Sequence, residues 1–397
     1  MRRALEGVRV LDLTQAYSGP FCTMNLADHG AEVIKIERPK TGDQTRTWGP
    51  FLNDFSAYFA YVNRNKKGIT LDLSSEEGKK IFKGLVKEAD VVVENFKVGT
   101  MDKLGLGYDI LKEINPSIIY GSISGFGLEG DMAKRPCYDI VAQAMSGMMS
   151  VTGYPDAPPV KIGPSVGDSY SGAYLCIGVL MALYKRCQTG EGSRIDISMV
   201  DTLFSTMENF VVKYTVEGET PTRNGNVDPG IAPFDSFQAK DGMFVMGCGT
   251  DRMFAGLCEA MGREELLTHP RFDTNGKRCD NYQPDLKDIV EEWTMTKTID
   301  ELEEIICARK IPFGRIQDIP TVTESDLVKG RNMIWEVEQP GMDATVRIPG
   351  CPVKIHGEED AVQKASPQLG EDTEAVLEEL LGITEEDIQK LKDDEVI

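Results

Sequence analysis

Residues 163–183 read GPSVGDSYSGAYLCIGVLMAL, and the rest of the chain is organised around this stretch. Small and polar residues open it, and a long apolar segment without Lys or Arg follows. Apolar and aromatic side chains recur there with a helical period, at Tyr170, Tyr174, Ile177, Met181 and Tyr184. We expect a buried helix, because both of its faces are apolar. Asp168 and Ser169 are suited to start it by capping free N–H groups, and a simple helix cap is one interpretation of Asp168.

Short apolar segments on both sides of this stretch predict the strands of a parallel sheet. Helical patterns separate these strands, among them Ser18–His29, Glu76–Glu88 and Met199–Val216, and the segment Tyr138–Val151 belongs to the same half. Strands that alternate with helices are typical of a doubly wound, Rossmann-like α/β domain. The predicted strands are Val8–Leu13, Glu32–Glu37, Ile69–Leu73, Asp90–Glu94, Ser117–Ser122 and Arg194–Ser198.

The polar stretch Glu217–Gly230 (EGETPTRNGNVDPG) is the clearest linker in the chain. A smaller α+β domain is expected after it, and the chain turns back near Pro320–Gly330. The resulting division is a large domain over 1–216 and 323–397, a linker over 217–230 and a small domain over 231–322. The elements expected after the linker are Asp241–Cys248, Arg252–Met261, Leu286–Met295, Thr298–Ala308 with a capping box to Glu301, Ile334–Val337, Thr345–Ile348, Glu374–Leu381 and Glu385–Lys392.

Composition and charge exclude several classes of protein. The net charge of −21 over 397 residues argues against nucleic acid or an anionic membrane as a partner. The nine cysteines form no C-x-x-C pair, which predicts reduced thiols in a cytoplasmic protein. The three histidines lack metal-ligand spacing, so no metal is expected. There is no signal-peptide pattern, and the longest apolar run, Tyr174–Tyr184, is 11 residues long and too short to span a bilayer.

Two motifs invite interpretations that the neighbouring residues disfavour. Gly125–Gly130 (GFGLEG) matches a dinucleotide-binding pattern, but Asp131–Pro136 is a poor first helical turn. Gly167–Ser171 (GDSYS) suggests a serine hydrolase, but it lacks the G-x-S-x-G pattern. Neither a nucleotide cofactor nor a hydrolytic serine is therefore expected.

Motifs along essentially the whole chain resemble those of the family III CoA-transferases, the CaiB/BaiF family. The opening segment LDLTQAYSGPFCTMNLADHGAEVIKIERP (Leu11–Pro39) is similar to the family's first strand and turn. The other matching segments are Gly42–Arg46, Asn63–Lys67, Val93–Phe96, Ser124–Gly127, Tyr138–Gly147, Gly167-Asp168, Thr189–Gly192, Asp196–Met199, Asp241-Gly242 and Pro270–Phe272.

The family contains transferases, such as formyl-CoA and carnitine CoA-transferases, and α-methylacyl-CoA racemases. The racemases use a His-Asp pair, and this chain has Tyr138 where they carry the histidine before Asp139-Ile140. A phenol is a weak base at pH 7, so the transferase branch is favoured. The alternatives are an acyl-CoA racemase or epimerase and, in another class, a CoA-binding regulatory protein without turnover.

The resemblance implies a mechanism in which Asp168 attacks the thioester and forms a mixed anhydride and then an aspartyl-CoA thioester. Its place at a helix N-terminus is expected to favour the ionised carboxylate. Gly247 and Gly249 are expected to form a lid over the anhydride, and Tyr138 and Asp139 to belong to the substrate pocket. By their positions in the family motifs, the candidate CoA-binding residues are Ala16, Tyr17, Arg38, Leu71, Asn95, Phe96, Lys103, Arg135 and Met199.

Within this set, Arg38 and Lys103 suit the phosphates and Phe96 suits the adenine ring. Two departures from the formyl-CoA transferases leave the acyl substrate open: Tyr17 replaces a Gln, and Pro136 replaces a Lys for which Arg135 is the substitute. The expected partners are an acyl-CoA, a carboxylic acid and a second copy of the chain, and CoA is a substrate rather than a tightly bound cofactor. The resemblance also implies open-ring subunits that interlock as an obligate homodimer.

Overall fold

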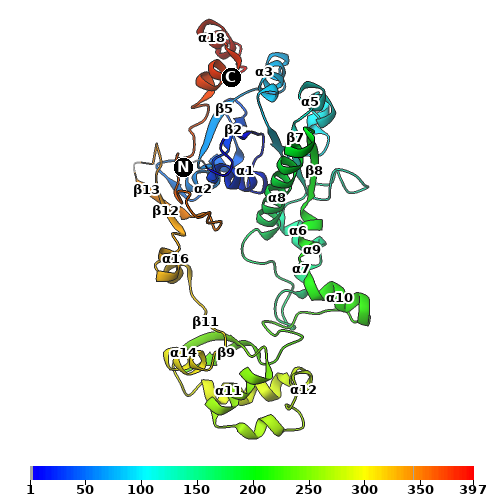
Figure 1. The fold of residues 1–397 in the computed structure, drawn as a ribbon, viewed down its shortest axis with the longest axis vertical. Helices are drawn as coiled ribbons and strands as arrows, with labels where there is room; N and C mark the ends of the chain where they lie inside the picture. Colours follow the sequence, from blue (N-terminus) through cyan, green and yellow to red (C-terminus); the bar gives the residue numbers. More distant parts are fainter. Residues whose placement is uncertain (1–2, 343) are drawn as a thin grey trace. The chain divides into compact units, whose positions relative to one another are not determined.

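The computed structural model describes residues 3–342 and 344–397, which divide into two compact units (Figure 1). The first unit contains the described residues up to Ser150 together with Lys161–Pro221 and Asp326–Ile397. The second contains Val151–Val160 and Thr222–Ser325. The segment Val151–Val160 therefore belongs to the second unit, although the sequence predicts a single domain part over residues 1–216.

A six-stranded sheet forms the centre of the first unit, with the strand order β5-β2-β1-β6-β7-β8. All neighbouring strands in it are parallel, and Val10 in β1 pairs with Val33 in β2 and Val91 in β6. The order reverses between β1 and β6, so a topological switch point lies between these strands. The α/β class is confirmed. The strands are β1 (Arg9–Asp12), β2 (Glu32–Glu37), β5 (Lys66–Thr70), β6 (Val91–Glu94), β7 (Ile119–Ser124) and β8 (Ser193–Ser198).

Helices cover both faces of this sheet. On one face, α3 (Glu76–Lys87), α5 (Tyr108–Ile114) and α17 (Thr373–Leu381) share an apolar core with side chains such as Tyr120 of β7. The next residue, Gly121, faces α8 instead, where a Cβ atom would lie 2.8 Å from Leu175. On this second face α8 (Val166–Thr189) packs along α1 (Ser18–Asp28). The contact requires glycine, because a Cβ on Gly172 would come within 2.4 Å of the Ser18 carbonyl oxygen.

Smaller elements complete the first unit and connect the strands. Antiparallel β12 (Ile334–Glu338) and β13 (Thr345–Pro349) carry a separate apolar cluster that includes Trp335 and Cys351. The other elements are η1 (Gln44–Thr47), β3 (Phe51–Leu52), β4 (Phe55–Ser56), α2 (Ala57–Asn63), α4 (Thr100–Lys103), α6 (Asp139–Met145), α7 (Met148–Val151), α9 (Met199–Ser205), α10 (Glu208–Glu217), α16 (Asp326–Gly330) and α18 (Glu385–Asp393).

The second unit packs helices against a small antiparallel sheet of order β11-β10-β9. Phe237, Phe244 and Phe254 are buried in its core. The capping box between Thr298 and Glu301 is present. The elements are β9 (Phe234–Ala239), β10 (Gly242–Gly247), α11 (Asp251–Met261), η2 (Glu264–Thr268), α12 (Asn275–Asp280), η3 (Tyr282–Leu286), α13 (Lys287–Thr294), α14 (Ile299–Ala308), β11 (Phe313–Arg315) and α15 (Ile319–Thr323).

Several predicted boundaries are wrong for identifiable reasons. Strand β5 begins at Lys66, three residues before the predicted start, because the buried ammonium of Lys66 pairs with Asp12 at 3.0 Å. Strand β7 runs to Ser124 rather than Ser122. The predicted helix Met199–Val216 is interrupted between α9 and α10, where Glu208 has a φ of 46°. The segment Tyr138–Val151 contains two helices, α6 and α7, separated at Gly147 with a φ of 91°.

The long helix α8 differs from its prediction in two respects. It begins at Val166, so Asp168 is its third residue and not its N-cap. The predicted apolar stripe is exposed in this chain: Tyr170 is 42% exposed, Met181 67% and Tyr184 70%. Among the described residues, α8 is also the one helix whose length and composition would suffice to cross a membrane. Its packing against α1, β7 and β8 is that of a core helix of an α/β layer, which passes the same test.

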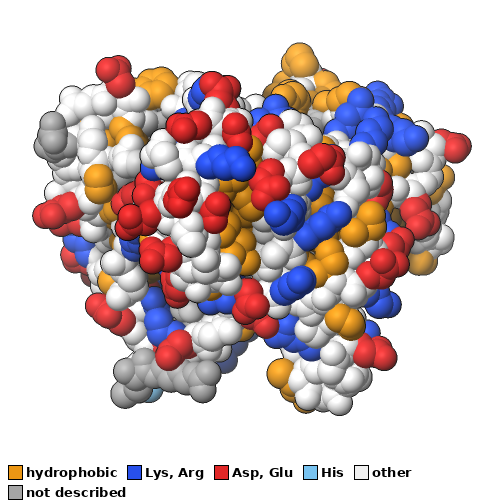
Figure 2. Space-filling model, turned by 90° about the horizontal axis from the view of Figure 1, so that it is seen from above, with side chains coloured by type: hydrophobic (Ala, Val, Ile, Leu, Met, Phe, Trp, Pro, Cys, Tyr) orange, Lys and Arg blue, Asp and Glu red, His pale blue; other side chains and the backbone are white. Residues whose placement is uncertain are grey.

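Charged side chains of both signs cover the face of the molecule drawn in Figure 2. Acidic side chains are spread across this face, and Lys and Arg side chains lie between them. The net charge of −21 is therefore compatible with locally basic positions. A small anionic ligand needs only such local positions.

Candidate active site

A cavity of about 380 Å³ lies in the first unit where strands β1, β6, β7 and β8 end. Gln15 and Asn95 follow the two strands that flank the switch point, and two hydrogen bonds of 2.8 Å connect them. Ligands of open α/β sheets bind at this place in the topology. The cavity is lined by Gln15, Ala16, Ser18, Gln44, Asn95–Val98, Ile123–Gly125, Ala133, Arg135–Tyr138, Asp168 and Met199.

Asp168 reaches this cavity from the first turn of α8, and another carboxylate caps that turn. The backbone N–H of Gly167 donates to Asp139 Oδ1 at 2.7 Å, and the Gln143 amide donates to Asp139 Oδ2 at 2.8 Å. Ser165, the N-cap residue, makes no side-chain capping bond. The interpretation of Asp168 as a helix cap is therefore wrong. Asp139 performs the capping and leaves the Asp168 carboxylate available to a ligand.

The surroundings of Asp168 make its carboxyl group unusually basic. Burial and the nearby charge of Asp139 together raise the pKa of Asp168 to about 7. No cation and no hydrogen-bond donor among the described residues opposes this shift. The expectation that the helix N-terminus favours the ionised form is thus wrong, because burial and the charge of Asp139 raise the pKa of Asp168. A basic carboxylate without a protein partner is suited to nucleophilic attack.

Aromatic side chains lie beside Asp168. The Tyr17 ring centroid is 5.9 Å from that of Tyr58 and 6.5 Å from that of Tyr61, and Trp48 is 5.8 Å from Tyr58. Burial and the Asp168 charge raise the pKa of Tyr58 to about 12, so this phenol is protonated at neutral pH. Burial raises the pKa of Tyr17 still further. These phenols are therefore neutral groups next to the carboxylate.

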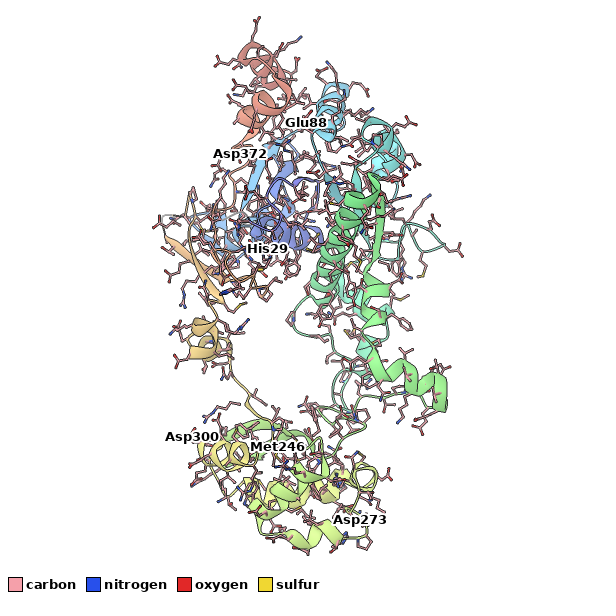
Figure 3. All side chains as sticks on the ribbon, in the orientation of Figure 1. His29, Glu88, Met246, Asp273, Asp300 and Asp372 are labelled. Carbon is pink, nitrogen blue, oxygen red and sulfur yellow. The ribbon has the colours of Figure 1, made fainter. Side chains whose placement is uncertain are left out.

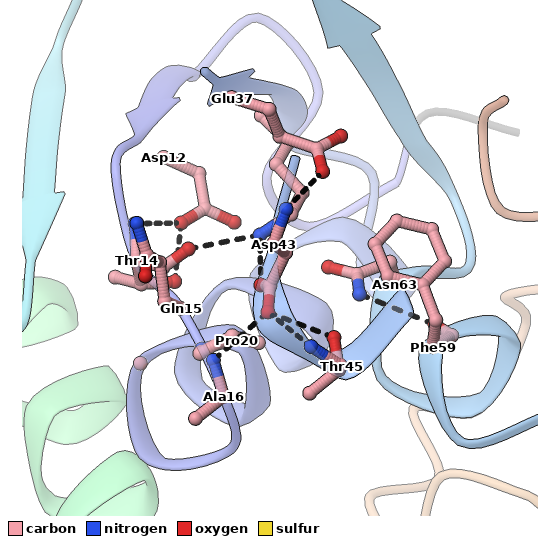
Figure 4. A network of polar contacts seen from close by, with 12 residues as sticks. Asp12, Thr14, Gln15, Ala16, Pro20, Glu37, Asp43, Thr45, Phe59 and Asn63 are labelled. Atoms are coloured by element: carbon pink, nitrogen blue, oxygen red, sulfur yellow. Dashed lines mark hydrogen bonds and ion pairs between the residues drawn. The ribbon is translucent and has the colours of Figure 1, made fainter. Parts of the chain in front are cut away.

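A buried ion pair supports the backbone of the loop Gln15–Ala16 (Figure 4). Lys35 Nζ lies 2.8 Å from Asp43 Oδ2, and both side chains are fully buried. Lys35 also donates to the Thr14 carbonyl oxygen at 2.9 Å, and Asp43 Oδ1 accepts from the Ala16 N–H at 3.2 Å. These contacts support the left-handed backbone of Ala16, whose φ is 64°. The wall of the cavity at Ala16 is thus set by residues that do not line it.

A second cavity of about 310 Å³ lies beside the first. Gln15 and Phe96 line both cavities. Arg38 and Leu71, two of the predicted CoA-binding residues, line the second one. The other lining residues are Ile36, Glu37, Asp72–Ser74, Thr100 and Leu104.

Most of the predicted ligand-binding residues converge on these two cavities. Lys103 is an exception: it ends α4 on the surface, and its neighbours Thr100 and Leu104 line the second cavity instead. Tyr17 is not among the residues that line either cavity, and its ring packs against those of Tyr58 and Tyr61. The first cavity contains Ala16, Asn95, Phe96, Arg135, Tyr138, Asp168 and Met199, and the second contains Arg38, Leu71 and Phe96.

The two predicted lid glycines belong to the second unit. Gly247 ends β10, and Gly249 lies in the turn to α11. Figure 3 labels Met246, the residue before Gly247, in this unit. A Cβ on Gly249 would meet no atom within 4 Å, so the turn has open space around it.

Sequence reasoning missed several residues of the first cavity. Gln15, Lys97 and Cys137 are immediate neighbours of predicted residues, and that adjacency was the available signal. Ser124 lies in the quoted segment Ser124–Gly127, but its role depends on burial, which the segment does not reveal. The residues that line the cavity include no histidine; His29 follows α1, where Figure 3 labels it. Tyr138, at the racemase histidine position, is 72% exposed. No group of three potential metal ligands occurs among the described residues.

The fold and the site define an α/β protein with a ligand cavity at its switch point and a basic, unpartnered carboxylate in that cavity. The family model that matches the sequence is that of "CoA-transferase family III", over residues 5–373. The chain belongs to this family, as its motifs indicate.

Characterised relatives and solved structures agree with this membership. The chain is 41% identical to an acetyl-CoA:oxalate CoA-transferase of Acetobacter aceti, over 94% of this chain and 95% of the relative. It is 40% identical to a succinyl-CoA:mesaconate CoA-transferase of Haloarcula hispanica, over 95% and 96%. A CaiB/BaiF family protein from Brucella suis superimposes with a TM-score of 0.83 at 37% identity, covering 96% of this chain and all of that one.

Proposed function

We propose that this protein transfers coenzyme A from an acyl-CoA thioester to a free carboxylic acid through a covalent intermediate on Asp168. The observation that supports this most directly is the Asp168 carboxylate, which lies in the cavity with a raised pKa and without a protein partner. The family membership and the CoA-transferases among the relatives support the reaction class.

The proposed reaction needs neither ATP nor an oxidant. An Asp168 oxygen attacks the thioester carbonyl carbon, the C–S bond breaks, and CoA thiolate leaves a mixed anhydride. The thiolate then attacks the aspartyl carbonyl, which releases the first acid and forms an aspartyl-CoA thioester. The second acid attacks that carbonyl and expels CoA thiolate, which attacks the new acyl group and frees Asp168. One thioester replaces another, so the exchange is close to thermoneutral.

The two cavities suit the two ends of CoA. The second cavity offers the apolar surfaces of Leu71 and Phe96 to an adenine ring and the Arg38 guanidinium to a phosphate. The first cavity would then take the pantetheine arm and the thioester, with Arg135 and Lys97 at its wall. Gln15 and Phe96 line both cavities and therefore lie where the two cavities adjoin.

The acid partner in this proposal is a small dicarboxylic acid. The names of the relatives include oxalate, mesaconate and glutarate, each with two carboxyl groups. One carboxylate has to react with Asp168, and Arg135 or Lys97 can pair with the other. That Gly247 and Gly249 form a flexible lid over the anhydride stays a proposal; Gly249 has open space around it, whereas Gly247 is paired with Phe234 in the small sheet.

A second copy of the chain is the proposed occupant of the exposed apolar stripe on α8. Tyr170, Met181 and Tyr184 on this helix are exposed, and Phe204 in α9 and Tyr214 in α10 are as well. An exposed apolar surface of this kind is typical of an interface in an obligate oligomer. Light scattering during a denaturant titration tests this proposal. We expect dissociation and unfolding to coincide, whereas a folded monomer at low concentration would contradict the interlocked dimer.

A panel of acyl-CoA donors and acids tests the reaction, with mass spectrometry to detect new CoA esters. We expect dicarboxylic acids to accept CoA and matched monocarboxylic acids to accept it poorly. Hydroxylamine added with the acyl-CoA donor should modify the peptide that contains Asp168, because it attacks an activated aspartyl group but not a free carboxylate. Modification of another peptide, or none, would contradict the covalent mechanism.

Deuterated water separates the transferase from a racemase. The first cavity has no histidine in its lining, so a 2-methylacyl-CoA should gain no α-deuterium above the uncatalysed rate. Rapid α-exchange would assign the protein to the racemase branch.

A further inference from the structure

The hydroxyl of Ser124 is a buried polar group that has no hydrogen-bond partner in the part of the chain that the structure describes. Ser124 is the last residue of β7, is 9% exposed and lines the first cavity together with Asp168. Its Oγ atom is buried and has no hydrogen-bond partner among the described residues. An unpaired buried hydroxyl costs on the order of 1–3 kcal/mol, so its persistence calls for an explanation.

The neighbouring serines at the same edge of the sheet find partners. Ser122 Oγ, two residues earlier in β7, donates to Glu94 Oε1 at 2.6 Å. Ser198 in β8 is the register partner of Ser124 in β7, and its Oγ accepts from the Asp201 N–H at 3.1 Å. Polar partners are therefore available at this edge, and Ser124 differs from Ser122 and Ser198 in that it belongs to the lining of the cavity. The partner it lacks has to come from whatever occupies that cavity.

We propose that the Ser124 hydroxyl is a catalytic-site donor that hydrogen-bonds to a carbonyl oxygen of the bound acyl-CoA. This inference rests on the proposed function, which places the thioester and the pantetheine arm in the first cavity. Both parts carry carbonyl oxygens, of the thioester or of an amide, and the hydroxyl donates to either with the same chemistry. No bond to Ser124 forms or breaks. At the thioester the hydrogen bond would strengthen as negative charge develops on the oxygen.

The carboxyl end of β7 and the first turn of α8 both border the first cavity. Gly121 faces α8, whereas Ser124 alternates with it and shares the face of Tyr120, so Ser124 borders the cavity at the end of the strand and not beneath the helix. Asp168 is in the first turn of the same helix and Ser124 is at the carboxyl end of the same strand. An acyl group that Asp168 attacks in this cavity therefore lies within the space that Ser124 also lines.

Two substitutions of Ser124 and one matched control test the proposal on the full-length protein. Ser124→Ala removes the hydroxyl and leaves the volume nearly unchanged, and Ser124→Thr keeps a hydroxyl. The control is Ser171→Ala, because Ser171 Oγ in α8 is also buried and has no partner among the described residues, but Ser171 does not line the cavity. Each variant is assayed for CoA transfer with the donor and acid on which the wild type is active, and thermal unfolding checks its fold.

We expect kcat/KM to fall at least 10-fold in Ser124→Ala, to recover in Ser124→Thr and to stay within 2-fold in Ser171→Ala. A fall in kcat with an unchanged KM identifies the thioester oxygen as the partner, and a rise in KM with an unchanged kcat identifies a pantetheine carbonyl. A change of less than 2-fold in Ser124→Ala, or an equal loss in Ser171→Ala, would overturn the proposal. All of these outcomes require an active wild type. If the wild type is inactive with every donor, the proposed function is refuted and not the role of Ser124.

Discussion

Two aspartates in the first unit, the fully buried Asp12 and the half-buried Asp168, have opposite electrostatics. Asp12, at the end of β1, is fully buried next to Lys66 at 3.0 Å and accepts hydrogen bonds from Thr14 and Thr23. Burial alone would raise the pKa of Asp12, but Lys66, Lys35 and these hydroxyls outweigh it and lower the pKa to about 2. Asp168, in the first turn of α8, has a second carboxylate nearby and no cation among the residues that the structure describes, and its pKa is raised to about 7.

This difference separates a structural carboxylate from a reactive one. The interactions that stabilise the Asp12 anion also occupy its oxygens and remove it from chemistry. Asp168 lacks such interactions, so its free anion costs stability and is available to attack a thioester.

Asp168→Ala should lower CoA transfer by several powers of ten, because in the proposed mechanism this carboxylate carries the acyl and CoA intermediates. The fold should persist, since Asp168 makes no hydrogen bond that the structure needs. Turnover with mass-spectrometric detection measures the loss, and circular dichroism checks the fold. Retention of more than a few per cent of the wild-type rate would exclude the covalent role.

Asp12→Ala should act in the opposite way and destabilise the fold. It leaves the fully buried Lys66 ammonium without its anion, and breaking a buried pair in this manner costs roughly 3–5 kcal/mol. Denaturant unfolding measures the free energy of unfolding, with Asp168→Ala as the matched control. If Asp12→Ala were no less stable than Asp168→Ala, the two aspartates would not differ as described.

The transfer rate should rise with pH through about 7. A raised pKa means that Asp168 is protonated below that pH, and the protonated carboxyl group is a poor nucleophile. The logarithm of kcat/KM should therefore increase by about one per pH unit below pH 7 and level off above it. The measurement is a pH profile between 5.5 and 9 with a donor stable over this range. A flat profile across pH 6–8 would show that Asp168 has an ordinary carboxyl pKa.

Asp139→Asn should produce the smallest of these effects, a shift of that midpoint to lower pH. The amide removes the like charge but keeps an oxygen that can accept from the Gly167 N–H. Because burial is the larger cause of the raised pKa, we expect a shift of about one pH unit or less. The same pH profile measures it. A purely structural role would lower the rate at every pH and leave the midpoint in place.

Much of the fold could be predicted from sequence, because the strands of the parallel sheet are short apolar runs between helical patterns. The motifs identified the family and drew attention to Asp168, and most of the predicted ligand residues do line the two cavities. These inferences succeed because burial periods and glycine or proline signals are local properties of the chain.

Other properties depend on residues that meet only in the folded chain. The start of α8 is set by Asp139, 28 positions before the Gly167 N–H that it caps. Lys66 enters a strand because Asp12, 54 positions away, neutralises it. The pKa of Asp168 and the unpaired hydroxyl of Ser124 follow from burial beside particular neighbours. Sequence determined which groups this protein has for chemistry, and the tertiary structure decided their reactivity, because solvation and charge depend on distances in space.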